Sequence, residues 1–211
     1  MPISITFIII AVTVLASLFA WQNQNLMENW VHHPQSVARN NEWWRLLTSG
    51  FLHADFMHLF FNMFSLYFFG GVVENQFMAV FGFTTGAILY VLLYLVAIIA
   101  SDLPTYFKHK NDSRYYSLGA SGGVAAIIFA SIYFNPLTEM LIFPIPIPIR
   151  GYIFGALYLF YSYYLSTRSS GDGINHSAHF YGAAFGFVVS IILIPSQLLN
   201  FFQTIIQSIA G

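Results

Sequence analysis

The sequence has no cysteine and very little charge. Without cysteine, the chain cannot form disulfides, thiolate nucleophiles, cysteine-ligated zinc sites or covalent haem links. Seven Lys and Arg residues and eight Asp and Glu residues make up 7% of the 211 residues, whereas about a quarter of a soluble domain is charged. The basic residues are scattered and form no stripe that could follow a phosphate backbone, which excludes nucleic acid as a partner.

Long apolar runs take the place of charge, and the chain is 57% hydrophobic and 19% aromatic. A run of about 20 apolar residues can cross a bilayer as a helix. The runs lack the alternation of a membrane β-barrel strand. We therefore predict an all-α fold, a polytopic membrane bundle of six transmembrane helices that forms one domain over residues 1–211. The predicted spans are 4–21, 52–73, 78–100, 118–134, 150–166 and 178–195.

The segments between the spans differ in character. Residues 22–51 are amphipathic and carry Trp43 and Trp44, which suit a membrane interface, so this segment is predicted to fold. Prolines at 144, 146 and 148 exclude a helix there and predict an extended turn. No internal repeat is evident, which argues against a transporter.

Strongly polar residues recur at one depth of the predicted bundle. If the spans alternate in direction, the second, fourth and sixth begin at the same membrane face. His58 and Asn62 open the second span one helical turn apart, Ser121 opens the fourth, and His179 opens the sixth. Polar groups inside a bilayer are costly and usually face the bundle interior, where they pair or do chemistry. His53 falls off the face of His58 and is predicted to be interfacial or structural.

Glycines surround Ser121 and follow His179. Gly119 and Gly122 leave a bare backbone beside the serine, while Gly182 and Gly186 share a helix face with His179. Small residues at this spacing let membrane helices approach closely. The pattern therefore predicts that the fourth and sixth spans touch and that Ser121 Oγ hydrogen-bonds to His179.

A serine with a histidine beside it suits nucleophilic catalysis, because the imidazole takes the hydroxyl proton. We predict a Ser121–His179 dyad without a carboxylate, since Asp55 lies at the membrane edge and Asp172 in a loop. The Ser121 N–H begins a helix and lacks an intrahelical partner there, so it can donate to an oxyanion. His58 and Asn62 are candidate donors to the same oxygen.

Several short motifs carry a family resemblance. They are "GASG" at 119–122, "AH" at 178–179 followed by Gly182 and Gly186, "HADFMHLFFN" at 53–62, "WWR" at 43–45 and "GGVVE" at 70–74. Together they resemble the rhomboid family of intramembrane serine proteases. The resemblance implies that Ser121 is the nucleophile and His179 the general base, with an oxyanion hole formed by His58, Asn62 and the Ser121 amide.

The resemblance also implies the reaction and the partners. A peptide bond in or beside a transmembrane segment of a protein substrate is hydrolysed through an acyl-enzyme, without a metal or another cofactor. Small residues are expected at the scissile bond, with helix-destabilising residues nearby. Residues 167–177 would cap the site, and the aromatic fifth span, with Phe154, Tyr158, Tyr161 and Tyr164, would be a lateral gate.

The sequence departs from the family pattern at two positions. Ala125 stands where many members carry an aromatic residue that packs on the histidine, and Tyr181 stands where a small residue is common. The family places such a site in the bacterial inner membrane, opening to the extracytoplasmic side. The positive-inside rule favours the opposite orientation, because most basic residues lie on the site face and only Arg150 on the other. We adopt the family orientation, because the positive-inside rule is a bias and Arg45 is expected to be buried in the folded first loop.

Other functions remain as alternatives. A catalytically inactive rhomboid-like module could bind membrane proteins or serve in their quality control, although such relatives typically lack the serine or the histidine. A zinc enzyme could use His58, His176 and His179, although no carboxylate ligand is apparent. A channel or transporter is disfavoured by the missing repeat and by a single polar cluster on one side.

Overall fold

Six apolar helices lie near the positions that the sequence predicts. The computed structural model describes residues 4–142, 145–168 and 173–210. The six helices are α1 (Ile5–Gln22), α5 (Phe56–Phe81), α6 (Phe83–His109), α7 (Ser121–Phe134), α8 (Gly151–Ser166) and α9 (His176–Leu193). By length and composition α1, α5, α6 and α9 can cross a membrane, and α7 is apolar but has only 14 residues. The predicted all-α bundle is confirmed, while the count of six crossings stays a prediction.

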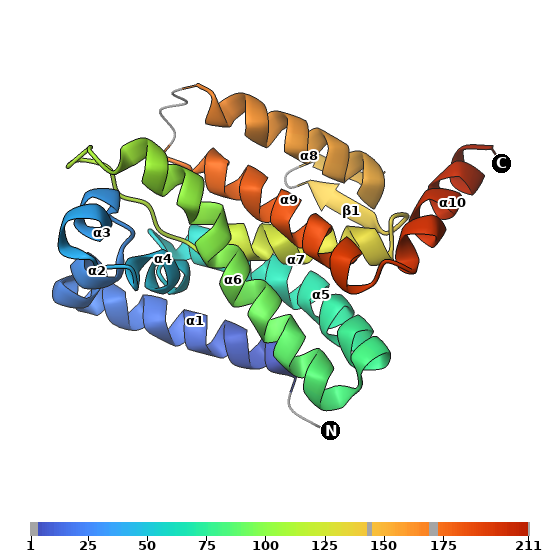
Figure 1. Ribbon diagram of the computed structural model, residues 1–211, viewed down its shortest axis with the longest axis horizontal. Helices are drawn as coiled ribbons and strands as arrows, with labels where there is room; N and C mark the ends of the chain where they lie inside the picture. The colour runs from blue at the N-terminus through green and yellow to red at the C-terminus, as the bar shows by residue number, and fades with distance from the viewer. Residues whose placement is uncertain (1–3, 143–144, 169–172, 211) are drawn as a thin grey trace.

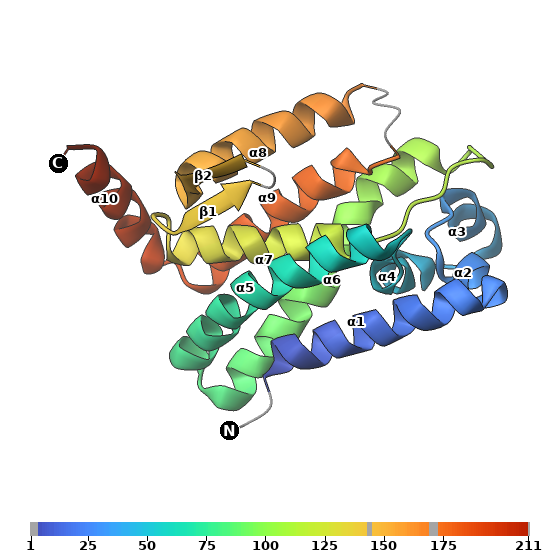
Figure 2. The same cartoon turned by 180° about the vertical axis from the view of Figure 1, so that it is seen from behind.

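Helix α7 forms the centre of the bundle. It lies between α5, α6 and α9, whereas α8 lies at the edge beside α9, and α1 packs on the other side of α5 (Figures 1 and 2). Every residue of α7 is buried except Ser121 and Ile128. A helix that is apolar all round suits such a position, because protein covers it on every side.

Helices α7 and α9 are in backbone contact. A Cβ atom at Gly182 would collide with the carbonyl group of Gly122, and one at Gly186 would collide with Ala126. On its other side, Gly122 faces the Ser101 side chain of α6. The missing side chains therefore let three helices converge immediately after Ser121.

The segment 22–51 is folded, as predicted. It contains α2 (Gln24–Trp30), α3 (Pro34–Asn40), α4 (Arg45–Thr48) and the short 3-10 helix η1 (Ser49–Phe51). Arg45 is buried and donates hydrogen bonds to Glu42 and to the carbonyl oxygens of Glu28 and Val31. The hydrogen bond from Arg45 lowers the pKa of the Glu42 carboxyl. The Arg45 guanidinium therefore connects α4 to the end of α2 and to Glu42 in the turn between α3 and α4.

The opposite end of the bundle carries a β-hairpin. Strands β1 (Glu139–Ile142) and β2 (Ile145–Arg150) pair antiparallel, with Glu139 opposite Arg150 (Figure 2). The prediction of extended chain without a helix was right. It missed the pairing of the two strands, because local sequence does not show which residues lie opposite each other across a hairpin. Of the three prolines that prompted it, Pro144 lies outside the described residues.

The chain continues past Pro195 into a separate helix, α10 (Gln197–Ala210), which diverges from the bundle (Figure 1). Phe201 anchors its start, with its ring centroid 5.9 Å from that of Tyr133 and 5.5 Å from that of Phe187. Another set of apolar side chains on α10 is exposed, namely Leu199, Phe202, Ile206 and Ile209.

The contact between α7 and α9 generates a stability prediction. Gly182→Ala should lower the free energy of unfolding by about 1–3 kcal/mol, because its methyl group meets backbone that cannot rotate away. Gly71→Ala is the matched control, since a Cβ there has no neighbour within 4 Å. Thermal unfolding in detergent compares the two variants. Equal unfolding midpoints would show that the two helices are not held by this contact.

Candidate active site

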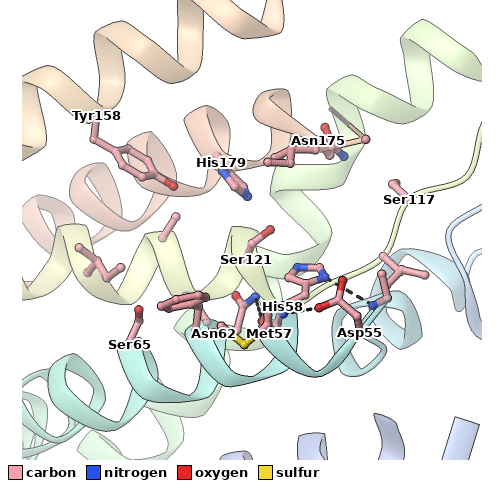
Figure 3. Close-up of a pocket in the computed structure, with 18 of the residues that line it drawn as sticks. Asp55, Met57, His58, Asn62, Ser65, Ser117, Ser121, Tyr158, Asn175 and His179 are labelled. Carbon is pink, nitrogen blue, oxygen red and sulfur yellow. Dashed lines mark hydrogen bonds between the residues drawn. The ribbon is translucent and has the colours of Figure 1, made fainter. Parts of the chain in front are cut away.

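A cavity of about 760 Å³ opens between α5, α7, α8 and α9. It brings together all four of the polar side chains predicted from the sequence. Ser121, His179, His58 and Asn62 line it, and Figure 3 shows them converging from three helices. Most of the remaining lining is apolar, so the polar groups are concentrated at one end of a hydrophobic cleft.

Ser121 is the first residue of α7 and is partly exposed to the cavity. Two residues earlier, Gly119 has φ 128°, a conformation that residues with a side chain rarely adopt. A Cβ atom at Gly119 would also lie 2.6 Å from Cε1 of His58. Position 119 therefore requires glycine for two reasons. A side chain would strain the turn into α7, and it would collide with the His58 imidazole ring.

His179 lies one turn into α9, and its ring points toward Ser121 across the cavity (Figure 3). Figure 3 draws no hydrogen bond between the two side chains, so the predicted Ser121–His179 bond is not formed among the described residues. The backbone contact of Gly122 with Gly182 sets the distance between the helices, and it leaves the two side chains facing each other without joining them. Catalytic hydrogen bonds are often long before substrate binds.

An aromatic residue from another helix supports His179. Ala125 is buried and lines the cavity, so α7 provides no ring at that position. Tyr158 of α8 stacks beside His179 instead, with centroids 6.3 Å apart and an interplanar angle of 19°. Tyr181 is exposed and stays out of the cavity lining. Of the proposed gate residues, Phe154 and Tyr158 line the cavity, whereas Tyr161 and Tyr164 are exposed.

His58 and Asn62 lie on one face of α5. Asn62 is buried, and its side-chain amide donates to the His58 carbonyl oxygen at 2.9 Å. The Ala54 N–H approaches His58 Nδ1 at 3.5 Å, and the Asp55 carboxylate caps the helix by accepting from the His58 N–H at 2.8 Å. With Nδ1 as acceptor, the neutral His58 ring carries its proton on Nε2, the nitrogen that faces Gly119.

His53 has a different environment from His58, although the two rings lie in edge-to-face contact 4.9 Å apart. It is fully buried in the turn before α5, and its Nε2 accepts a 3.4 Å hydrogen bond from the Ala120 N–H. Its Nδ1 lies 2.9 Å from Ser17 Oγ of α1, which donates to the Phe51 carbonyl oxygen. His53 thereby connects the turn before Ser121 to α1. This is a structural role, one of the two that the sequence predicted for His53.

The burial of His53 also affects its protonation. Desolvation lowers the pKa of His53 to about 3, so the ring is neutral at pH 7. A neutral ring with its proton on Nδ1 can donate to Ser17 and accept from Ala120. The contact with Ala120 therefore depends on an uncharged imidazole, because a protonated ring has no acceptor nitrogen.

Sequence reasoning missed a carboxylate that acts at a distance from the cavity. Asp102 of α6 is buried and accepts a hydrogen bond from Asn175, the residue that caps α9 four positions before His179. The sequence placed it in a loop, because the predicted third span ends at residue 100, whereas α6 continues to His109. Asp172, the carboxylate considered from the sequence, lies outside the described residues.

The described residues contain no group of three or more His, Asp and Glu side chains that could hold a metal ion. His176 and His179 lie with ring centroids 6.0 Å apart in an edge-to-face arrangement. The zinc alternative therefore lacks a ligand set within this part of the chain. A hydroxyl, an imidazole and several N–H donors around one cleft suit acyl transfer instead.

Several known proteins are similar to this chain. The chain matches the family model described as "Rhomboid domain" over residues 40–196. It is 28% identical over 167 residues to the putative rhomboid protease YdcA of Bacillus subtilis, covering 75% of this chain and 71% of that protein. It is 29% identical to the rhomboid protease AarA of Providencia stuartii, covering 77% of this chain and 60% of that protein. It is 33% identical to the mitochondrial RHOMBOID-like protein 12 of Arabidopsis thaliana, over 66% of this chain and 43% of that protein.

The buried His53 predicts a pH dependence of stability. Because burial holds the pKa of His53 near 3, only the unfolded chain binds a proton at this residue between about pH 6.5 and pH 3. Stability should therefore fall as the pH is lowered through that window. His53→Gln, which keeps a donor and an acceptor but does not titrate, should show a shallower slope. Thermal unfolding in detergent against pH measures both, and identical slopes would contradict the prediction.

Proposed function

The chain belongs to the rhomboid family, and on that premise we propose that it is an intramembrane serine endopeptidase acting through a Ser121–His179 dyad. The observation that carries the proposal is the convergence of Ser121, His179, His58 and Asn62 on one cavity between membrane helices. Each residue alone has a structural explanation. Their meeting at the start of α7, beside a cleft that is otherwise largely apolar, favours catalysis.

In the first half of the proposed reaction, His179 accepts the hydroxyl proton while Ser121 Oγ attacks the carbonyl carbon of the scissile bond. The new C–O bond produces a tetrahedral intermediate with a negative oxygen. His179 then gives its proton to the leaving nitrogen as the C–N bond breaks, and the acyl group stays on Ser121. In the second half, His179 takes a proton from water, which attacks the ester carbon. His179 then returns this proton to Ser121 Oγ as the ester C–O bond breaks and the acid is released.

The negative oxygen of the intermediate needs donors fixed before the reaction begins. The Ser121 N–H lies in the first turn of α7, where backbone amides have no intrahelical partner. His58 can donate through Nε2 and Asn62 through its amide, and both line the cavity beside the serine. These three groups form the proposed oxyanion hole. Tyr158, stacked beside His179, supports the orientation of the base.

The family and the apolar helices make the chain an integral membrane protein in contact with the lipid bilayer. Transmembrane segments of other membrane proteins are the proposed substrates, since the cleft lies between helices and has largely apolar walls. We further propose that residues 1–211 act as one domain and need no cofactor. The proposed location is a bacterial inner membrane, with the cavity open to the extracytoplasmic side.

Substitution of the dyad tests the proposal directly. Ser121→Ala and His179→Ala should each abolish cleavage of a transmembrane substrate, and each should abolish labelling by a fluorescent fluorophosphonate. Circular dichroism and thermal unfolding of the same preparations should show that the fold is retained. A folded wild-type protein that is neither labelled nor active would support the alternative, a catalytically inactive rhomboid-like binding or quality-control module.

The oxyanion donors give a graded prediction. His58→Ala and Asn62→Ala should each reduce the cleavage rate by about 10² to 10³, because each removes one donor to the intermediate. Ser65→Ala, which changes another side chain in the cavity lining, is the control and should have little effect. Cleavage rates at saturating substrate compare the three variants. Full activity without Asn62 would remove this residue from the proposed oxyanion hole.

A further inference from the structure

Asp102 is a buried carboxylate in the apolar helix α6, and it does not line the cavity. A carboxylate in such surroundings is costly unless hydrogen-bond donors surround it. Its two oxygens have partners on different segments. One oxygen accepts from Asn175, and the other accepts from Ser49 and lies 3.4 Å from His32 Nδ1. Asn175 begins the helix of His179, and Ser49 and His32 contact Gly119 and Ser117, which precede Ser121.

The first oxygen holds the start of the helix that carries His179. Asn175 Nδ2 donates to Asp102 Oδ1 at 3.3 Å. The amide oxygen of Asn175 accepts from Thr105 Oγ1 and from the Ala178 N–H, both at 3.1 Å. These partners fix the orientation of the Asn175 amide. Its oxygen faces the Ala178 N–H and Thr105 Oγ1, and its nitrogen faces Asp102. The Asn175 backbone oxygen also accepts from the His179 N–H at 3.3 Å.

The second oxygen holds the segment that leads to Ser121. Ser49 Oγ donates to Asp102 Oδ2 at 3.4 Å, and the Ser49 carbonyl oxygen accepts from the Gly119 N–H at 3.0 Å. His32 and Ser117 exchange two backbone hydrogen bonds of 3.0 Å, and His32 Nδ1 lies 3.1 Å from Ser117 Oγ. Two short chains of contacts thus connect this oxygen to the residues immediately before Ser121.

We propose that Asp102 is a positioning residue that sets His179 relative to Ser121. Asp102, on α6, holds Asn175 at the start of α9 and, through Ser49 and His32, the residues 117–119 that precede α7. The catalytic consequence rests on the proposed function. Loss of the Asp102–Asn175 bond would let the first turn of α9 fray, and that turn carries His179. A displacement of about 1 Å in a catalytic group can reduce the rate by about 10²-fold.

An exchange of the two side chains tests this contact. In Asp102→Asn, one of the two carboxylate oxygens becomes an amide nitrogen, so either the Asn175 nitrogen or the Ser49 hydroxyl loses its acceptor. In Asn175→Asp, two carboxylates meet. The double variant restores the bond with its direction reversed, since the amide introduced on α6 can donate to the carboxylate introduced at the start of α9 and keep its own oxygen for Ser49. Aspartate is also as good a helix cap as asparagine.

We expect each single variant to be labelled by a fluorophosphonate about 10-fold to 100-fold more slowly than wild type. The double variant should recover to within about threefold of wild type. Glu74→Gln is the matched control, because Glu74 is a buried carboxylate that binds Ser4 and Thr6 at the start of α1, away from the cavity. It should lower the unfolding midpoint without a comparable loss of labelling.

Hydrogen exchange gives a readout that does not depend on catalysis. The Ala178 and His179 amides should exchange faster in Asp102→Asn and return to the wild-type rate in the double variant. If Ser121 of the wild type is never labelled but exchange behaves in this way, the tether stands and only the proposed protease activity fails. Failure of the double variant to recover, or unchanged exchange and labelling in both single variants, would overturn the proposal. Faster exchange with normal labelling in an active protein would overturn it as well.

Discussion

The backbone contact between α7 and α9 is the interaction on which the rest of the structure depends. Inside a bilayer, lipid tails are as apolar as leucine, so helices associate through close packing and hydrogen bonds rather than through burial from water. Gly122 and Gly182 provide that packing one residue after Ser121 and three residues after His179. The same contact that stabilises the centre of the bundle therefore holds the two polar side chains at a fixed separation.

A second constraint acts at the end of the bundle that carries the cavity. Irregular backbone at membrane depth is tolerated where protein satisfies its polar groups. The turn before Ser121 meets this requirement through His53, which accepts from Ala120, and through Ser49, which accepts from Gly119. The folded segment 22–51 therefore supports the site from outside the cavity, since its Ser49 holds the turn before Ser121.

Local sequence patterns predicted a large part of this arrangement. Apolar runs located α1, α7, α8 and α9 within about three residues, because the length of a membrane helix is set by bilayer thickness. Helices α5 and α6 continue eight and nine residues past their predicted ends at 73 and 100. Helical spacing placed His58 with Asn62 and placed Gly182 and Gly186 on the face of His179. The β-hairpin and the support of His179 by Tyr158 were missed, because both join residues that local spacing does not relate. The predicted Ser121–His179 hydrogen bond was wrong, since spacing indicates which face a side chain occupies but not the distance across to its neighbour.

By itself, the sequence determined that the chain is a helical membrane protein, that it resembles a family of intramembrane proteases, and which side chains gather at one depth. These properties follow from composition and from the 3.6-residue period, both of which are local. Only the tertiary structure decided that Asp102 accepts a hydrogen bond from Asn175, the capping residue of the His179 helix, and that the aromatic ring beside His179 comes from α8. Contacts of this kind depend on how separate helices are rotated and translated against each other, and that is set by the packing of the whole bundle.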